Sequence, residues 1–301
     1  MNYLIIVTGP TGIGKTKLSI QLAQHFSAEI LSADSRQIYR EMKIGTAVPT
    51  DEELAGTKHH FIGNVSIHDY YNVSKYEDEA IELISRLHQS NPFVLLTGGT
   101  GLYINAVCKG IDLMPDPDPK IRMELNRQLS EEGVESLQKQ LKVLDLEYYK
   151  TVDLNNSARL IRALEICKQT GKPYSSFRKK KDKVRAFKTI KIALNTDRTV
   201  LYDRINKRVL SMVEEGLVEE VKALMPYKKL IALKTVGYQE LFDAFEGKHS
   251  IEKGIEYIQN SSRRYARKQI SWIRRDAEYK WFEPNQLKEI IDYIEEEVVR
   301  D

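Results

Sequence analysis

The feature that most constrains this chain is a glycine-rich segment close to its N-terminus, Gly9-Pro10-Thr11-Gly12-Ile13-Gly14-Lys15-Thr16. The apolar run from Tyr3 to Val7 precedes it, and a helical pattern carrying Leu18, Leu22 and Phe26 follows it. A strand, a glycine loop and a helix in this order are typical of a phosphate-binding loop, or P-loop. Its backbone N–H groups and the helix N-terminus attract anions. We therefore predict that residues 9–16 bind a diphosphate or triphosphate, with Lys15 as a mobile cation and the Thr16 hydroxyl as a ligand of Mg²⁺.

The overall composition is that of a soluble globular protein, with 301 residues of which 42% are hydrophobic and 30% charged. No apolar run reaches the length of a membrane span, and no charged-then-apolar leader opens the chain. Cys108 and Cys167 lack Cys-x-x-Cys spacing, which argues against a disulfide framework and a structural zinc site. We expect a cytoplasmic protein with free thiols and no membrane partner.

The net charge of +3 is unevenly distributed. Residues 159–191 contain twelve Lys or Arg against two acids, and residues 263–280 contain seven against two. Two basic islands in a nearly neutral protein suggest a polyanion larger than a nucleotide as partner. Solvated helix faces are the alternative interpretation of either island.

The order of apolar and amphipathic segments predicts an α/β fold. Buried strands are expected at 3–7, 29–33, 59–62, 93–97 and 189–194, with an amphipathic helix at 74–88. Three alternate prolines at 115, 117 and 119 break the pattern. Helices are then expected at 121–133, 134–144 and 158–170, and further ones from 199, 216, 235 and 261. The predicted domains are an α/β core with C-terminal helices, residues 1–112 and 188–301, and an inserted helical domain, residues 113–187.

Two positions at strand ends carry candidate chemistry. Asp34 follows the second strand, where ligands gather in α/β sheets, and can act as a general base or hold a metal-bound water. It also fits a capping box with Gln37 for a short helix through Tyr39. The fourth strand ends in Thr97 and two glycines rather than in the acid that hydrolysing P-loop enzymes place there, which weakens an ATPase interpretation. Thr100 can offer its hydroxyl to a phosphate, or the segment is a plain glycine turn.

Arginines also mark the second half of the chain. Arg204 and Arg208 are four residues apart on one helical face; a single arginine there is usually a salt-bridge partner, whereas two would clamp a phosphate. In the helix expected at 261–277, the six basic residues fall within about 140° of arc, opposite an apolar face. Such a helix suits contacts to a phosphate backbone.

Nine sequence blocks in one order resemble the bacterial tRNA dimethylallyltransferases, also called tRNA isopentenyltransferases. They are GPTGIGKT at 9–16, DSRQIY at 34–39, GTAVP at 45–49, GGTGLY at 98–103, NNSARLIRALE at 155–165, RINKRV at 204–209, GLVEEV at 216–221, TVGYQE at 235–240 and SRRYARKQISWIR at 262–274. Two departures stand out. Gly12-Ile13 replaces a common Ala-Ser pair, which removes one hydroxyl, and the C-terminal zinc finger of eukaryotic relatives is absent.

The resemblance implies a P-loop fold used without nucleotide hydrolysis. Dimethylallyl diphosphate would be the donor, and the acceptor N6 of the adenine just 3′ of the anticodon in tRNAs that read codons beginning with U. It also implies roles: residues 9–16, Arg208 and Mg²⁺ on Thr16 would bind the diphosphate. Thr100 would contact the bridging oxygen, and Asp34 would take the proton from the amine.

The resemblance further implies a tRNA-binding set in a monomeric enzyme whose inserted domain contacts the anticodon stem-loop. This set is Asp34, Ser35, Arg36, Gln37, Arg122, Met123, Ala158, Arg159, Leu160, Ile161, Arg162, Lys234, Gly237, Tyr238 and Gln239, with Arg264 and Lys268 from the basic helix. A P-loop nucleotide kinase and an adenylate prenyltransferase are alternatives, but they leave the basic islands without a role. A non-catalytic RNA-binding protein with a relic P-loop is a third.

Overall fold

A computed structural model describes residues 1–179 and 182–300. The chain divides into two compact units, the first made of residues 1–109 and 184–301 and the second of residues 110–183. Lys180 and Lys181, which belong to the basic island of residues 159–191, lie outside the described residues. Among the described residues, no helix is long and apolar enough to cross a membrane.

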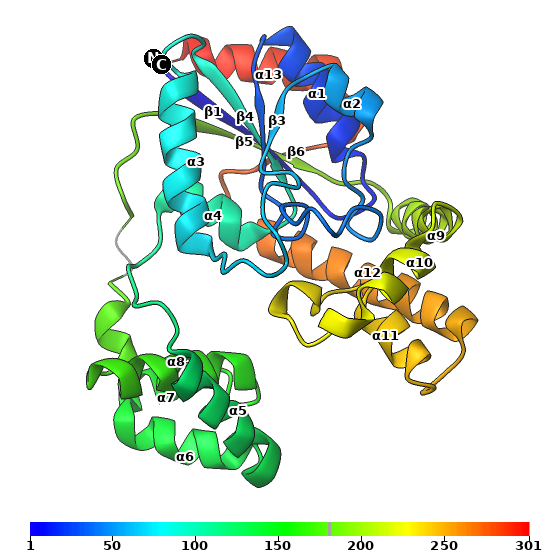
Figure 1. Cartoon of the computed structure of the whole chain (residues 1–301). Helices are drawn as coiled ribbons and strands as arrows, with labels where there is room; N and C mark the ends of the chain where they lie inside the picture. The colour runs from blue at the N-terminus through cyan, green and yellow to red at the C-terminus, as the bar shows by residue number, and fades with distance from the viewer. Residues whose placement is uncertain (180–181, 301) are drawn as a thin grey trace. The chain divides into compact units, whose positions relative to one another are not determined.

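The first unit is built on a parallel sheet with the strand order β3-β2-β4-β1-β5-β6 (Figure 1). Every adjacent pair is parallel. The strands are β1 (Tyr3–Thr8), β2 (Ile30–Ser32), β3 (His59–His60), β4 (Phe93–Gly98), β5 (Lys188–Leu194) and β6 (Lys280–Phe282). The predicted α/β class with a parallel core is confirmed. The strand expected at 189–194 is β5, but it is not followed by helices alone: β6 comes after it and has no counterpart among the predicted strands. Its three residues are too few to give a periodic signal.

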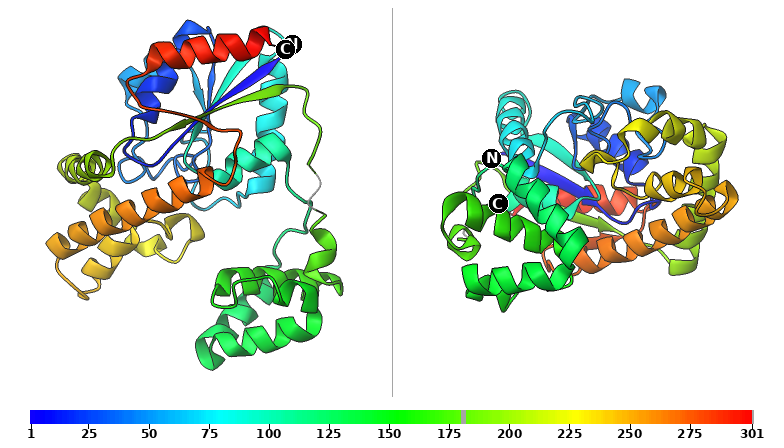
Figure 2. Two further views of the ribbon diagram at one scale, coloured as in Figure 1. Left: turned by 180° about the vertical axis from the view of Figure 1, so that it is seen from behind. Right: turned by 60° about the horizontal axis from the view of Figure 1, so that its bottom comes forward.

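Alternation along β1 divides the apolar core between the two faces of the sheet. Leu4 and Ile6 pack with α3 (Val73–Leu87) and α4 (Gly101–Lys109). Ile5 and Val7 pack with α1 (Lys15–His25) and α13 (Leu287–Val299) on the opposite face. Figure 2 shows the sheet and its covering helices from behind. Because helices cover both faces, the central strands are apolar throughout rather than alternating with polar residues.

Four further helices of this unit cluster beyond the carboxyl end of the sheet (Figure 1). They are α9 (Arg198–Glu214), α10 (Leu217–Ala223), α11 (Gln239–Phe245) and α12 (Ile251–Ile273). Helix α12 begins at Ile251, ten residues before the predicted start at 261. The Ser250 hydroxyl caps this start by accepting a hydrogen bond from the Lys253 amide. The short helix expected from Asp34 through Tyr39 does not form, since residues 35–38 make a turn. The remaining helix, α2 (Asp51–Ala55), has no counterpart among the predicted elements.

The second unit is a small helical bundle with its own core. It contains α5 (Pro119–Glu132), α6 (Val134–Leu144), α7 (Leu146–Tyr149) and α8 (Ser157–Thr170). Asp118 caps α5 by accepting hydrogen bonds from the amides of Lys120 and Ile121. The core comprises Leu125, Leu137, Leu141, Tyr148, Leu160, Ile161, Ala163 and Leu164.

Candidate active site at the phosphate-binding loop

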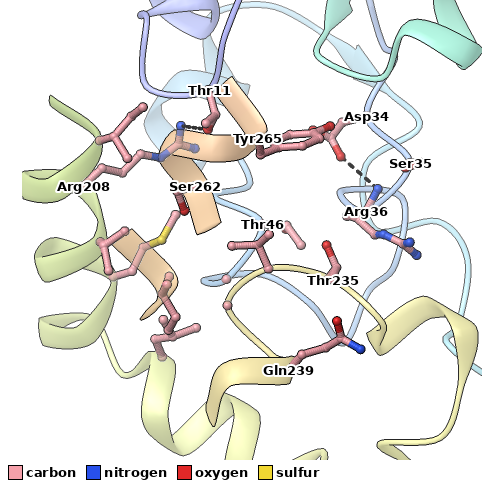
Figure 3. A pocket seen from close by; sticks show the side chains of 18 of the residues that line it. Thr11, Asp34, Ser35, Arg36, Thr46, Arg208, Thr235, Gln239, Ser262 and Tyr265 are labelled. Atoms are coloured by element: carbon pink, nitrogen blue, oxygen red, sulfur yellow. Dashed lines mark hydrogen bonds between the residues drawn. The ribbon is translucent and has the colours of Figure 1, made fainter. Parts of the chain in front are cut away.

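A cavity of about 440 Å³ lies in the first unit, among the loops that follow β1 and β2 and the helices α9 to α12 (Figure 3). Its polar wall contains Thr11 from the P-loop, Asp34, Ser35 and Arg36 from the loop after β2, and Arg208 from α9. Its apolar wall consists of Ile205, Val209, Met212, Leu217, Val236 and Ile258. Charged and apolar side chains therefore line the same cavity.

The P-loop joins β1 to α1 in the predicted order. Gly14 has a φ of 102°, a left-handed conformation that favours glycine, and directly precedes the first residue of α1. The Lys15 Nζ donates to the carbonyl oxygens of Gly9 at 3.0 Å and Pro10 at 2.9 Å. Burial, with a contribution from the neighbouring Arg208 charge, lowers the pKa of Lys15 to about 7. The Ile13 side chain is fully buried in the core, so only its backbone is available to an anion.

Both predicted arginines of α9 contact this loop. The Arg208 guanidinium donates to the Thr11 hydroxyl at 3.4 Å, and Arg204 donates to the Ile13 carbonyl oxygen at 3.4 Å. Burial lowers the pKa of Arg208. Arg208 lines the cavity, whereas Arg204 lines a separate cavity beside α1 and α13. Of the two α9 arginines, therefore, only Arg208 lines the candidate site.

Asp34 is fixed by its own turn. Its Oδ1 accepts hydrogen bonds from the amides of Arg36 at 2.9 Å and Gln37 at 3.4 Å. The capping box predicted with Gln37 is wrong, because the Oε1 of that side chain accepts from the Ser32 hydroxyl at 3.1 Å and its Nε2 donates to the carbonyl oxygens of Thr46 and Ala47. Asp34 is thus held by backbone amides while it lines the cavity. This arrangement is compatible with a general base and with a carboxylate that holds a metal-bound water.

Thr100 stands in the glycine turn between β4 and α4 and is tied to the Asp34 loop. Its Oγ1 accepts a hydrogen bond from the Ser35 amide at 3.1 Å, and its own amide donates to the Ala33 carbonyl oxygen. The turn is tightly enclosed, since a Cβ on Gly98 would lie 2.4 Å from that same carbonyl oxygen. Thr100 itself is not among the residues that line the cavity, although Ser35, to which it is bonded, does line it.

The residues present fit a magnesium ion that has one protein ligand. Thr97 stands at the end of β4, where hydrolysing P-loop enzymes place an acid. Its hydroxyl accepts a hydrogen bond from the Ser19 hydroxyl at 2.8 Å and donates to the Val7 carbonyl oxygen. Within residues 1–179 and 182–300, no cluster of three or more His, Cys, Asp or Glu could hold a metal. The half-buried Thr16 hydroxyl at the start of α1 remains, and Mg²⁺ commonly takes its other ligands from phosphate oxygens and water.

Tyr265 and Gln269 of α12 are among the site residues that are absent from the set predicted from the sequence. The amphipathic pattern puts Tyr265 on the packed face of this helix, yet it lines the cavity beside Asp34 (Figure 3). Although 40% of Tyr265 is exposed, partial desolvation of its ring beside the cavity and the nearby Asp34 charge raise its pKa to about 12. Gln269 is buried and bonded to Thr11 of the P-loop and to Gly99 of the turn after β4. The sequence feature that could have identified them is their position next to Arg264 and Lys268 in the same helical block.

The predicted tRNA-binding residues of the first unit fall into two groups. Asp34, Ser35, Arg36, Lys234, Gly237 and Gln239 line the cavity, and Arg264 and Lys268 are exposed on α12. Tyr238 is fully buried and donates its hydroxyl to Glu220, so this side chain is not accessible to RNA. The Gln37 side chain is likewise bonded within its loop. Arg263 contacts Asn206 and Asn260 rather than extending the exposed basic face.

In the second unit, burial again separates the predicted residues. Met123, Ala158 and Arg159 are exposed. Leu160 and Ile161 lie in the apolar core, because the apolar face of α8 must be buried, and their side chains are not available to RNA. Arg122 and Arg162 both pair with Glu165, which is 0% exposed, at 2.9 Å. These two arginines therefore have a structural partner already.

The fold and site define a P-loop α/β protein in which Thr11 of the glycine-rich loop and the half-buried Asp34 line one cavity. Comparison with known proteins gives the family. Residues 37–276 match the family described as IPP transferase. The chain is 53% identical over 298 residues to the tRNA dimethylallyltransferase of Christiangramia forsetii, with 99% of each chain covered.

Solved structures agree. The full-length tRNA isopentenylpyrophosphate transferase of Bacillus halodurans is 36% identical, with a TM-score of 0.73 over 100% of this chain and 98% of that one. A eukaryotic dimethylallyltransferase acting on tRNA is 26% identical, with a TM-score of 0.74 over 91% of this chain and 70% of that one. The chain belongs to the tRNA dimethylallyltransferase, or IPP transferase, family.

Proposed function

We propose that this protein transfers the dimethylallyl group of dimethylallyl diphosphate to N6 of the adenine 3′-adjacent to the anticodon, in tRNAs reading codons that begin with U. The products are N6-dimethylallyladenosine and diphosphate. The observation that carries the proposal is the single cavity that combines Thr11, Arg208 and Asp34. An anion-binding loop and a proton acceptor are the two elements that this reaction requires.

The donor half of the site stabilises the leaving group. As the C–O bond of the donor breaks, negative charge develops on the departing diphosphate. Fixed cations and amides aimed at that charge act most strongly in the transition state. The backbone amides of residues 12–16, together with Lys15 and Arg208, supply them. The Thr16 hydroxyl would hold Mg²⁺, which adds positive charge beside the diphosphate when bound.

The acceptor half activates the amine. The N6 nitrogen attacks the allylic carbon, a C–N bond forms as the C–O bond breaks, and the proton of the amine passes to the Asp34 carboxylate. An adenine within a stacked loop must first be turned out into the cavity. Thr100, held against Ser35, is proposed to contact the bridging oxygen.

The remaining polar surface suits the RNA. Arg264 and Lys268 of α12, and Met123, Ala158 and Arg159 of the helical unit, are exposed and can contact nucleotides of the anticodon stem-loop. All residues used belong to one chain, so a monomer suffices. Because the substrate is tRNA, the reaction takes place in the cytoplasm. A nucleotide kinase or an adenylate prenyltransferase would leave these surfaces without a role.

Mass spectrometry of tRNA incubated with the protein, Mg²⁺ and dimethylallyl diphosphate tests the proposal. The expected result is one added dimethylallyl group on the adenosine that follows the anticodon. A parallel incubation with labelled ATP and nucleoside monophosphates should give no phosphoryl transfer. Prenylation of adenylate but not of tRNA, or phosphoryl transfer, would contradict the proposal.

A further inference from the structure

Gln269 connects the two loops that the proposed reaction must hold together. It lies on α12 and is only 6% exposed. Its Oε1 accepts a hydrogen bond from the Thr11 amide at 2.9 Å, and its Nε2 donates to the Gly99 carbonyl oxygen at 3.1 Å. The partners fix the orientation of the amide, because the reversed orientation would set donor against donor and acceptor against acceptor.

Each end of this bridge belongs to a different half of the site. Thr11 is in the P-loop, whose amides would hold the donor diphosphate. Gly99 precedes Thr100, which is bonded to the Ser35 amide beside Asp34. The amide of Gln269 therefore sets the separation between the diphosphate loop and the loop that carries the proton acceptor.

The backbone around the Gln269 bridge is tightly packed. A Cβ on Gly99 would lie 2.2 Å from the Gln269 Nε2, and a Cβ on Gly101 would lie 2.3 Å from Cε2 of Trp272. Both neighbours come from α12, so this helix rests directly on the backbone of the turn. Tyr265, one turn earlier on α12, reaches the same Gly99 carbonyl oxygen at 3.5 Å.

We infer that Gln269 is a positioning residue: it holds the P-loop and the Gly98–Thr100 turn at the spacing needed for prenyl transfer. This inference rests on the proposed function. The hydrogen bond of Gln269 occupies the Thr11 amide, so Gln269 does not contribute to anion binding itself. Removing it should therefore impair the chemical step far more than binding of the diphosphate. Displacements near 1 Å in a site can lower a rate by about 10²-fold.

The test compares Gln269→Leu with Gln259→Leu. Gln259 is on the same helix and donates to the Asn206 carbonyl oxygen at 3.4 Å, away from both loops. For each variant, kcat with tRNA is measured by mass spectrometry, and the Kd for inorganic diphosphate by calorimetry. We expect Gln269→Leu to lower kcat by about 10²-fold while its Kd for diphosphate stays within about threefold. Gln259→Leu should match the parent in both.

A second variant guards against misfolding. Gln269→Glu keeps an acceptor for the Thr11 amide but cannot donate to Gly99, so its kcat should also fall. The inference is overturned if Gln269→Leu keeps kcat within about threefold, or if kcat, diphosphate affinity and melting temperature fall together in both variants. If the parent protein itself binds diphosphate but does not prenylate tRNA, the proposed function fails instead.

Discussion

Asp34 has a structural contact and a proposed chemical role that one substitution separates. Its Oδ1 holds two backbone amides. In Asp34→Asn the amide oxygen can keep these bonds, while the proton acceptor is removed. We expect prenyl transfer to fall by about 10²–10⁴-fold, with tRNA affinity and melting temperature nearly unchanged. Single-turnover kinetics provide the measurement, and a rate within about threefold of the parent would leave Asp34 only a turn-stabilising role.

Lys15 gives a pH dependence for donor binding. Its pKa of about 7 is below the ordinary lysine value, so free Lys15 is charged below pH 7 and gives up its proton above it. A bound diphosphate favours the charged form and raises the pKa. Binding at pH 8 should therefore take up close to one proton on Lys15, and affinity should fall as pH rises beyond about 7.

Calorimetry with inorganic diphosphate in buffers of different ionisation enthalpy measures this uptake. Diphosphate also titrates in this range, so Lys15→Arg is the matched control, because arginine stays charged. The parent should take up about one proton more than Lys15→Arg at pH 8 and no more than it at pH 6. Equal uptake at both pH values would show that Lys15 is already charged in the free protein.

At the scale of elements, α12 has faces with different tasks. Arg264, Arg267 and Lys268 are exposed, whereas Arg263 contacts α9 through Asn206. Changing the three exposed residues to glutamine should weaken tRNA binding and reduce the slope of log K against log salt by about 0.7–0.9 for each phosphate that the protein no longer neutralises. Arg263→Gln is the control and should leave the slope unchanged. If the triple variant keeps the parent slope, the basic face is only solvated.

The sequence predicted the positions of helices and of the P-loop better than the side-chain contacts between them. The P-loop and the helices at 74–88 and 134–144 carry strong local signals, and the structure has them within a residue or two. The turn after Asp34 differs from its prediction because Gln37 bonds to Thr46 and Ala47, partners that only the folded loop brings near. For the same reason, burial of Tyr238 and Leu160 could not be foreseen from motif membership. Periodicity gives a helix face, but not what covers it.

At the scale of the whole molecule, two units have separate cores, so their stabilities can be changed separately. Leu141 is fully buried in the second unit. Leu141→Ala should destabilise that unit by about 2–5 kcal/mol. The first unit should keep its stability and its affinity for diphosphate, while modification of tRNA should fall because the helical unit no longer presents an ordered surface to the RNA.

The chain provides its own probes for this experiment. Both tryptophans, Trp272 and Trp281, belong to the first unit, so their fluorescence in a urea titration reports that unit alone. Circular dichroism reports both. In Leu141→Ala, part of the dichroism transition should move to lower urea while the fluorescence midpoint stays. Leu4→Ala, a matched change in the first core, should lower the fluorescence midpoint; a shared shift in both variants would mean that the units unfold together.

The glycine turn after β4 also limits how such an enzyme can diversify. Gly98, Gly99 and Gly101 meet neighbouring atoms so closely that no side chain can be added without displacing them. This turn therefore offers mutation almost no position at which a larger side chain would fit. We expect a descendant lineage that adopts a bulkier or shorter prenyl donor to acquire its changes at Val209, Met212 or Ile258, whose side chains line the cavity.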